Sequence, residues 1–246
     1  MRSIIEIIES IDGPNIPNIN PTVIYNEGWM TRILINQSIK ENTKLKDKTE
    51  LYELDFGKIS NWTSEALISS PFVHANIRRE GYTHADMALG DFEINYELRG
   101  ELIIPTTAKI FGIIEAKMGS NLSIRVNNAD HYNQASRTLA CIASQTYNKD
   151  CRIFFMVVAP ATKLLSFRID EQIYMETMIQ EIEARFNAYP VNFRTEQNMD
   201  LIIAKARTCK VWSISYEKWI NSIVDPDAKK YLLDFYTKTL HWNRIR

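Results

Sequence analysis

The sequence contains little of what several protein classes require. Its three cysteines, Cys141, Cys151 and Cys209, show no CxxC or Cys/His spacing, which argues against a zinc site and against a disulfide framework. So few cysteines favour a reducing compartment. No apolar run reaches the roughly 18 residues of a membrane helix. Glu6 and Glu9 interrupt the apolar run that a signal peptide would need. We therefore expect a cytoplasmic protein without a membrane partner.

An excess of charge is missing too, because the formal net charge is −1. Nucleic-acid binding would therefore need a local patch or metal-bridged phosphates, since there is no global basic field. The chain lacks a G-x-S-x-G elbow, a P-loop and a dinucleotide glycine fingerprint. Its four histidines have no ligand spacing. With 45% apolar residues and only eight glycines, residues 1–246 are expected to form a single domain with a substantial core.

The apolar patterns predict alternating helices and strands. Helices are expected over 3–11, from about Asn26, and over 64–69, 129–145, 170–186 and 197–206, with Ser215 and Pro226 beginning the last two. Strands are expected over 86–96, 109–117, 152–159 and 210–214. Residues 13–21, 41–50 and 99–105 are expected to connect them. This order predicts an α/β three-layer sandwich with a central mixed sheet flanked by helices.

The most informative segment is the apolar strand that ends in Glu115-Ala116-Lys117. Strand alternation places Glu115 and Lys117 on one face and Ala116 on the other. If the strands 86–96 and 109–117 pair antiparallel, Asp86 lies beside Glu115 and Lys117. Asp91 lies about 17 Å further along the strand and faces the opposite side. Asp86 is therefore the predicted partner.

These residue types suit a divalent cation and a water molecule. Mg²⁺ prefers oxygen ligands, so the carboxylates of Asp86 and Glu115 and the carbonyl of Ala116 are candidate ligands. The ion would activate a bound water, which Lys117 would orient or help to deprotonate. Taken alone, a Glu-x-Lys at a strand end is also a common solvated surface.

The arrangement resembles the PD-(D/E)xK, or restriction-endonuclease-like, superfamily. Asp86 matches its lone acid and Glu115-Ala116-Lys117 its E-x-K half, although Ala85 stands where the superfamily's name has proline. The resemblance covers roughly 20–160 and implies a helix–strand–strand–strand–helix–strand core, with additions on either side. The chain is also similar to uncharacterised prokaryotic proteins with Tyr-Asn-Glu-Gly-Trp and Thr-His-Ala-Asp segments.

The resemblance implies two further site residues. Glu27, in Tyr25-Asn26-Glu27-Gly28-Trp29, would support the metal, although it could equally serve the helix dipole. Gln134 would lie near the site on the helix after E-x-K, unless it is an ordinary helical residue. The expected catalytic residues are Asp86, Glu115, Lys117 and Gln134, and the expected metal ligands are Asp86, Glu115, Ala116 and Glu27.

The expected function is that of a nuclease, dependent on Mg²⁺ or Mn²⁺, that hydrolyses phosphodiester bonds in DNA. RNA as a substrate, a homodimer and a protein partner are left open. The alternatives are a non-catalytic domain of the same fold that binds nucleic acid or protein, and a structural subunit in which E-x-K is only surface. A basic rim for the phosphate backbone is predicted from Arg78, Arg79, Lys109, Arg125 and Arg137.

Overall fold

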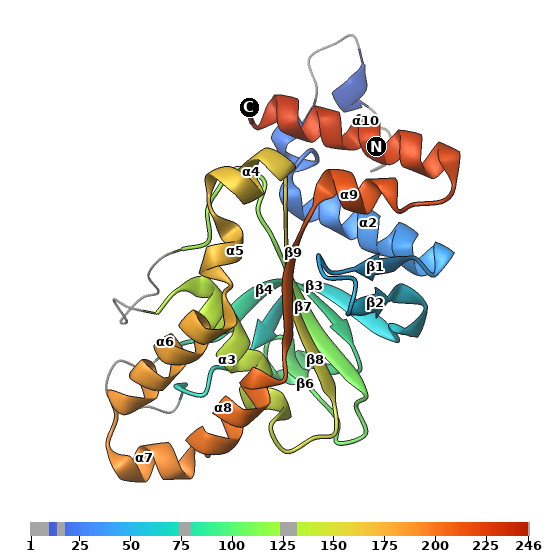
Figure 1. Ribbon diagram of the computed structural model, residues 1–246. Helices are drawn as coiled ribbons and strands as arrows, with labels where there is room; N and C mark the ends of the chain where they lie inside the picture. Colours follow the sequence, from blue (N-terminus) through green and yellow to red (C-terminus); the bar gives the residue numbers. More distant parts are fainter. Residues whose placement is uncertain (1–9, 14–17, 74–79, 124–131, 246) are drawn as a thin grey trace.

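The protein, described here from a computed structural model, contains a seven-stranded sheet with helices on both faces (Figure 1). The structure describes residues 10–13, 18–73, 80–123 and 132–245. In spatial order the strands are β5 (Glu93–Asn95), β6 (Glu101–Ile103), β3 (Asn61–Ile68), β4 (Thr83–Gly90), β7 (Ile110–Ala116), β8 (Arg152–Ala159) and β9 (Lys210–Ser215). The pairs β5–β6, β3–β4 and β4–β7 are antiparallel, and β3–β6, β7–β8 and β8–β9 are parallel. The predicted α/β class and mixed sheet are confirmed.

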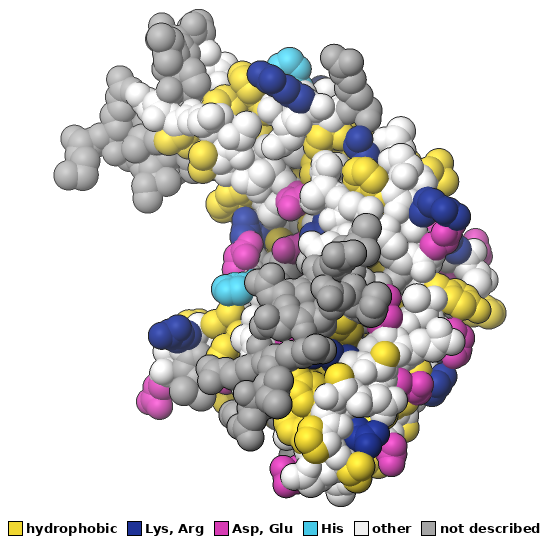
Figure 2. Space-filling view, turned by 90° about the vertical axis from the view of Figure 1, so that its left-hand side faces the viewer, with side chains coloured by type: hydrophobic (Ala, Val, Ile, Leu, Met, Phe, Trp, Pro, Cys, Tyr) yellow, Lys and Arg dark blue, Asp and Glu magenta, His cyan; other side chains and the backbone are white. Residues whose placement is uncertain are grey.

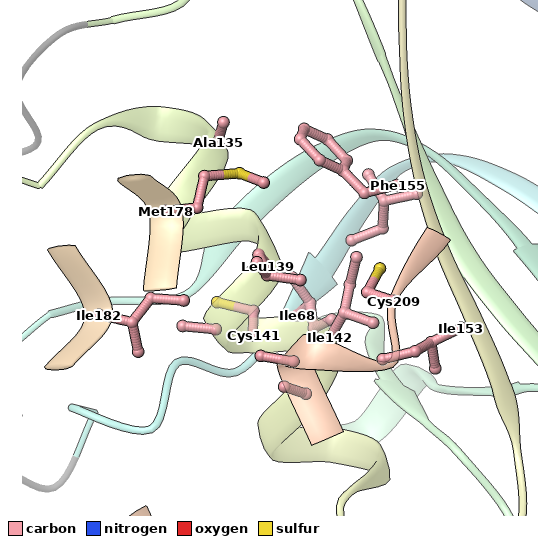
Figure 3. Close-up of a cluster of buried hydrophobic side chains, with 14 of the residues drawn as sticks. Ile68, Ala135, Leu139, Cys141, Ile142, Ile153, Phe155, Met178, Ile182 and Cys209 are labelled. Atoms are coloured by element: carbon pink, nitrogen blue, oxygen red, sulfur yellow. The ribbon is translucent and has the colours of Figure 1, made fainter. Parts of the chain in front are cut away.

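One face of the sheet is covered mainly by α3 (Gln134–Thr146), α6 (Met175–Asn187) and α8 (Met199–Arg207). Figure 3 shows Leu139 and Ile142 of α3 between the sheet residue Phe155 and the α6 residues Met178 and Ile182. Burying a side chain of this size contributes about 1.5–3 kcal/mol, so this layer holds α3 firmly on the sheet. The short helices on this side are α4 (Ala161–Ser166), α5 (Ile169–Gln172) and α7 (Val191–Glu196).

The other face carries α2 (Glu27–Glu41), α9 (Tyr216–Asn221) and α10 (Pro226–Trp242), together with the hairpin of β1 (Lys44–Lys46) and β2 (Glu53–Asp55) (Figure 1). The buried Trp219 of α9 donates from Nε1 to Ser38 Oγ of α2 at 2.9 Å, which joins these two helices. Single-turn 3₁₀ helices are η1 (Ser10–Asp12), η2 (Pro21–Val23), η3 (Phe56–Lys58) and η4 (Tyr96–Leu98).

Several predicted elements are confirmed, and capping explains where they begin. The side chain of Asn26 accepts a hydrogen bond from Trp29 N at the start of α2, and Ser215 accepts one from Lys218 N at the start of α9. Pro226 occupies the first turn of α10. The strands predicted over 109–117, 152–159 and 210–214 correspond to β7, β8 and β9, and the helix predicted over 197–206 corresponds to α8.

Other predictions are wrong. Residues 64–68 of the segment 64–69, predicted as helix, belong to β3, because pairing with β4 and β6 outweighs the helix propensity of the segment. Strand β4 occupies Thr83–Gly90 rather than 86–96, and the chain turns at Gly90, whose φ is 117°. The predicted connectors 41–50 and 99–105 contain β1 and β6.

The helix boundaries also differ from prediction. The predicted helix 170–186 is divided into α5 and α6, because the chain is extended at Tyr174. Helix α3 begins at Gln134 after its cap Asn133. Most of the helix predicted over 3–11 lies outside the described residues, and so do residues 129–131 of the helix predicted over 129–145. Within the described ranges, no helix is long and apolar enough to cross a membrane.

Candidate active site

Asp86 and Glu115 lie beside each other where β4 and β7 separate. The last antiparallel pair of the two strands is Met87 with Ile114, so Asp86 and Glu115 are the next residues on either strand. The amide of Ala116 donates to Asp86 Oδ2 at 2.8 Å. The antiparallel pairing predicted from the sequence therefore brings Asp86 to the E-x-K segment.

Asp91 is separate from this group. Its carboxylate accepts hydrogen bonds from the amides of Lys109 and Ile110 at 2.7 and 3.2 Å, and from Ser60 Oγ at 2.6 Å. Lys109 and Ile110 lie at the beginning of β7, whereas Glu115 lies near its end. Asp91 thus belongs to the opposite end of the same pair of strands.

Glu115 and Lys117 form a buried pair. Lys117 Nζ donates to Glu115 Oε1 at 2.7 Å, and the two residues are 8% and 1% exposed. Gln134 Nε2 donates to the same Glu115 oxygen. The backbone of Gln134 is fixed in turn, because its amide donates to Ser123 O at 2.9 Å. The structure therefore brings Glu115, Lys117 and Gln134 into direct contact.

Glu27 approaches from the opposite layer of the sandwich. It is the first residue of α2, and its Oε2 accepts a hydrogen bond from Met118 N at 2.7 Å. Asn26 begins the helix just before it, and Tyr25 OH donates to Asp12 at 2.8 Å. The Tyr25–Trp29 motif thus places a carboxylate next to the residue that follows Lys117.

Burial and mutual repulsion shift the proton affinities of these groups. Burial and the nearby Asp86 raise the pKa of Glu115, and the opposing effect of Lys117 is smaller. Burial also raises the pKa of Glu27, although the Met118 amide and Lys117 lower it in part. Burial alone would lower the pKa of Lys117, but Glu115, Asp86 and Glu27 raise it by more. The acidic side chains around Lys117 therefore favour its charged form.

The donor set suits a hard divalent cation. The candidate ligands are carboxylate and carbonyl oxygens, and a cation would relieve the repulsion between the buried carboxylate of Glu115 and the half-buried carboxylate of Asp86. Among the described residues, however, no group of three or more His, Cys, Asp or Glu side chains is placed to hold a metal ion. Asp86 and Glu115 supply two such side chains. Mg²⁺ commonly binds one or two carboxylates and keeps several waters, so the residues present fit it.

The surface next to Glu27 is hollowed. A cavity of about 390 Å³ is lined by Asn26, Glu27, Met118, Gly119, Asn243 and Ile245. Figure 2 shows one concave face of the molecule, where acidic side chains lie together in the hollow with basic side chains beside them. The cavity lined by Glu27 offers room for a ligand next to this candidate carboxylate.

The predicted basic rim is not assembled from the residues that the structure describes. Arg137 turns inward, where its Nε lies 3.4 Å from Glu80 Oε2 and its Nη2 donates to Gly81 O at 3.2 Å. Lys109 lies at the far end of β7 and faces Asp150. Arg78, Arg79 and Arg125 lie outside the described residues. Arg137 and Lys109 each have an acidic partner and do not lie together, so the rim stays a prediction.

Sequence reasoning missed Glu181, which supports the start of α3. Its carboxylate accepts hydrogen bonds from Asn133 N at 3.0 Å and Ser136 Oγ at 2.6 Å. These contacts fix the first turn of α3, which carries Gln134. The partners are 45 and 48 residues apart along the chain, so no local pattern could have indicated them.

Comparison with known proteins gives no relative. No protein-family model matches the chain, and no curated protein or solved structure matches it. The resemblance to the PD-(D/E)xK superfamily therefore stays a prediction, which rests on the short motifs around Glu27, Asp86, Glu115, Lys117 and Gln134.

Proposed function

We propose that the protein is a nuclease, dependent on Mg²⁺ or Mn²⁺, that hydrolyses phosphodiester bonds in DNA and has a restriction-endonuclease-like core. The supporting observation is the meeting of Asp86, Glu115 and Lys117 where β4 and β7 separate. Gln134 joins this group directly, and Glu27 reaches it through the amide of Met118. Five candidate residues, from the interior of β4, the end of β7 and two helices, thus share one small region.

Asp86 and Glu115 would hold the cation, with the carbonyl oxygen of Ala116 as a third ligand and Glu27 in support. When bound, the cation would lower the pKa of a water molecule and neutralise charge on the scissile phosphate. Gln134 would keep Glu115 in place through the hydrogen bond to Oε1. The remaining positions around the cation would be filled by water and by phosphate oxygens.

Lys117 would position the attacking water and stabilise negative charge in the transition state. The hydrogen bond from Lys117 Nζ to Glu115 Oε1, at 2.7 Å, holds the side chain beside the candidate metal ligands, where it would orient the water or help to deprotonate it. In the reaction the water oxygen forms a bond to phosphorus while the bond to the leaving sugar oxygen breaks. The proton from the water passes to solvent, and the leaving oxygen takes one from solvent.

A cleavage assay on single- and double-stranded DNA and on RNA, with and without Mg²⁺ or Mn²⁺, tests this proposal. Asp86→Asn preserves an acceptor for the Ala116 amide but removes the charge, and Lys117→Ala removes the ammonium. Each variant is expected to lose at least about 100-fold in rate. Asp91→Asn, at the other end of the same strands, is the matched control and should cleave normally. Metal-independent cleavage, or cleavage that survives both site variants, would rule the proposal out.

A second candidate function is a non-catalytic domain of the same fold that binds nucleic acid or a partner protein. In the described parts of the chain no cluster of three or more metal-binding side chains is placed to hold a metal ion, and the net charge of −1 leaves a role that depends on a partner protein open. This candidate predicts binding that neither Asp86→Asn nor removal of divalent cations changes. Fluorescence anisotropy with labelled oligonucleotides, measured beside the cleavage assay, separates the two functions.

A further inference from the structure

Glu65 has an unusual backbone conformation next to the candidate site. It lies within β3, yet its φ is 56°, in the left-handed region. A residue with a Cβ adopts this region at a cost in free energy, and such residues are frequent at functional sites. A glutamate has no local reason to adopt it in the middle of a strand, so the surrounding structure must impose it.

The conformation coincides with a gap in the sheet at Asp86. Strands β3 and β4 pair on both sides of this position, with Ser64 opposite Met87 and Ala66 opposite Ala85. The register is the same before and after, so Glu65 and Asp86 face each other without pairing and no residue is inserted. On its other side, β4 ceases to pair with β7 after Met87. Asp86 is thus released from both ladders.

The released Asp86 makes a different contact. Its side chain, rather than its backbone, accepts the hydrogen bond from Ala116 N. Ala116 lies between Glu115 and Lys117, so this contact places the carboxylate of Asp86 beside the E-x-K segment. If Asp86 continued the antiparallel pairing, its backbone would be held opposite Glu115 and this orientation would change.

Arg32 of α2 holds the unusual segment in place. Its Nε donates to Ser64 Oγ at 2.9 Å, and its Nη2 lies 3.4 Å from Glu65 Oε1. Gly28 leaves room for this guanidinium, because a Cβ there would lie 3.0 Å from Arg32 Nη1. The helix that carries Glu27 therefore also clamps β3 opposite Asp86.

We propose that Glu65, in its left-handed conformation and clamped by Arg32, is a positioning residue that frees Asp86 from the sheet and aims its carboxylate at the cation site. The proposal rests on the proposed nuclease function for its purpose. In this proposal the backbone conformation of Glu65 positions Asp86, and the carboxylate of Glu65 serves only to hold that conformation.

The first test needs no metal and measures amide hydrogen exchange at Ala116 by NMR. Glycine and asparagine adopt a left-handed backbone readily, so in Glu65→Gly and Glu65→Asn the Ala116 amide should exchange as slowly as in wild type. Glu65→Val strongly disfavours it and should exchange at least about tenfold faster, toward the rate in Asp86→Ala. If valine prevents folding, Glu65→Ala replaces it and should exchange at an intermediate rate. Equal exchange in the glycine variant and in the valine or alanine variant would overturn the proposal.

The second test measures Mn²⁺ binding by calorimetry and DNA cleavage in the same variants. In the glycine and asparagine variants the affinity for Mn²⁺ and the cleavage rate should stay within about threefold of wild type. The valine or alanine variant should bind Mn²⁺ about tenfold more weakly or worse. If the glycine variant loses as much as the valine variant, the carboxylate matters rather than the backbone, and the proposal is wrong. If the wild type neither binds Mn²⁺ nor cleaves, the nuclease function fails, whereas the exchange measurement still decides whether Glu65 positions Asp86.

Discussion

The carboxylate of Glu27 accepts a hydrogen bond from the backbone amide of Met118 at 2.7 Å. This contact joins the first turn of α2 to the residue that follows Lys117, across the end of the sheet. Glu27 therefore has a structural role as an acceptor, whatever its charge contributes. Because glutamine keeps an acceptor and alanine does not, substitution separates the two roles.

Glu27→Gln should leave the free energy of unfolding within about 0.5 kcal/mol of wild type, because an acceptor for Met118 N remains. Glu27→Ala should lose about 1 kcal/mol or more, since the amide loses its partner. Cleavage should fall about 10- to 100-fold in both variants if the charge supports the cation. Urea denaturation and the cleavage assay measure these effects. A glutamine variant that cleaves at the wild-type rate would show that Glu27 is only a structural anchor.

The strands that the sequence predicted best are the most buried ones. In β7 and β8 the two layers of helices cover both faces, so the residues form nearly continuous apolar runs that are visible without the structure. Residues 64–68 of β3 were missed because Glu, Ala and Leu favour a helix locally. Only the neighbouring strands β4 and β6, which are distant in sequence, make this segment a strand.

The same distinction applies to the candidate site. The proximity of Asp86 to Glu115 followed from strand alternation and antiparallel pairing, which are regular and therefore predictable. Left-handed Glu65 and the support of α3 by Glu181 were not predictable. Each depends on contacts between elements that are far apart in sequence, and the residue type at these two positions does not indicate the role.

Gly112 in β7 is packed against an aromatic ring. A Cβ at this position would lie 2.4 Å from Cδ1 of Phe154 on the neighbouring strand, and Phe154 is itself buried against Trp212. Gly112→Ala should therefore lower the free energy of unfolding by about 1–3 kcal/mol. Gly81→Ala is the matched control, because within the described residues no atom beyond its chain neighbours lies within 4 Å of its added Cβ. Equal urea midpoints for the two variants would contradict this close packing.

Glu80 forms a buried ion pair with Arg185. Its Oε1 accepts a hydrogen bond from Arg185 Nε at 3.1 Å, its Oε2 accepts one from Ser70 Oγ at 2.8 Å, and both Glu80 and Arg185 are almost fully buried. Glu80→Ala should cost about 3–5 kcal/mol, because it leaves a buried charge without compensation. Asp150→Ala, which removes an exposed partner of Lys109, should cost at most about 1 kcal/mol. Thermal and urea unfolding of the two variants compare these values, and similar losses would disprove the buried pair's importance.

Asp91 makes stability depend on pH at the end of β4 away from the candidate site. Burial alone would raise the pKa of Asp91, but the hydrogen bonds from Ser60 and from the amides of Lys109 and Ile110 lower it by more. A lowered pKa means that the ionised form stabilises the fold above pH 3.8, the ordinary value, and that this stabilisation is lost as the pH falls through the lowered pKa.

Asp91→Asn should therefore be less stable than wild type at neutral pH, because the carboxylate that accepts these hydrogen bonds is replaced by a neutral amide. The difference should shrink as the pH falls below 3.8, since the wild-type carboxyl group then becomes neutral as well. Urea unfolding at neutral pH and at several acidic values measures the difference, with Asp150→Asn as an exposed control that should show little change. A gap between wild type and Asp91→Asn that stays constant or widens toward acid would show that the ionised carboxylate does not stabilise this strand end.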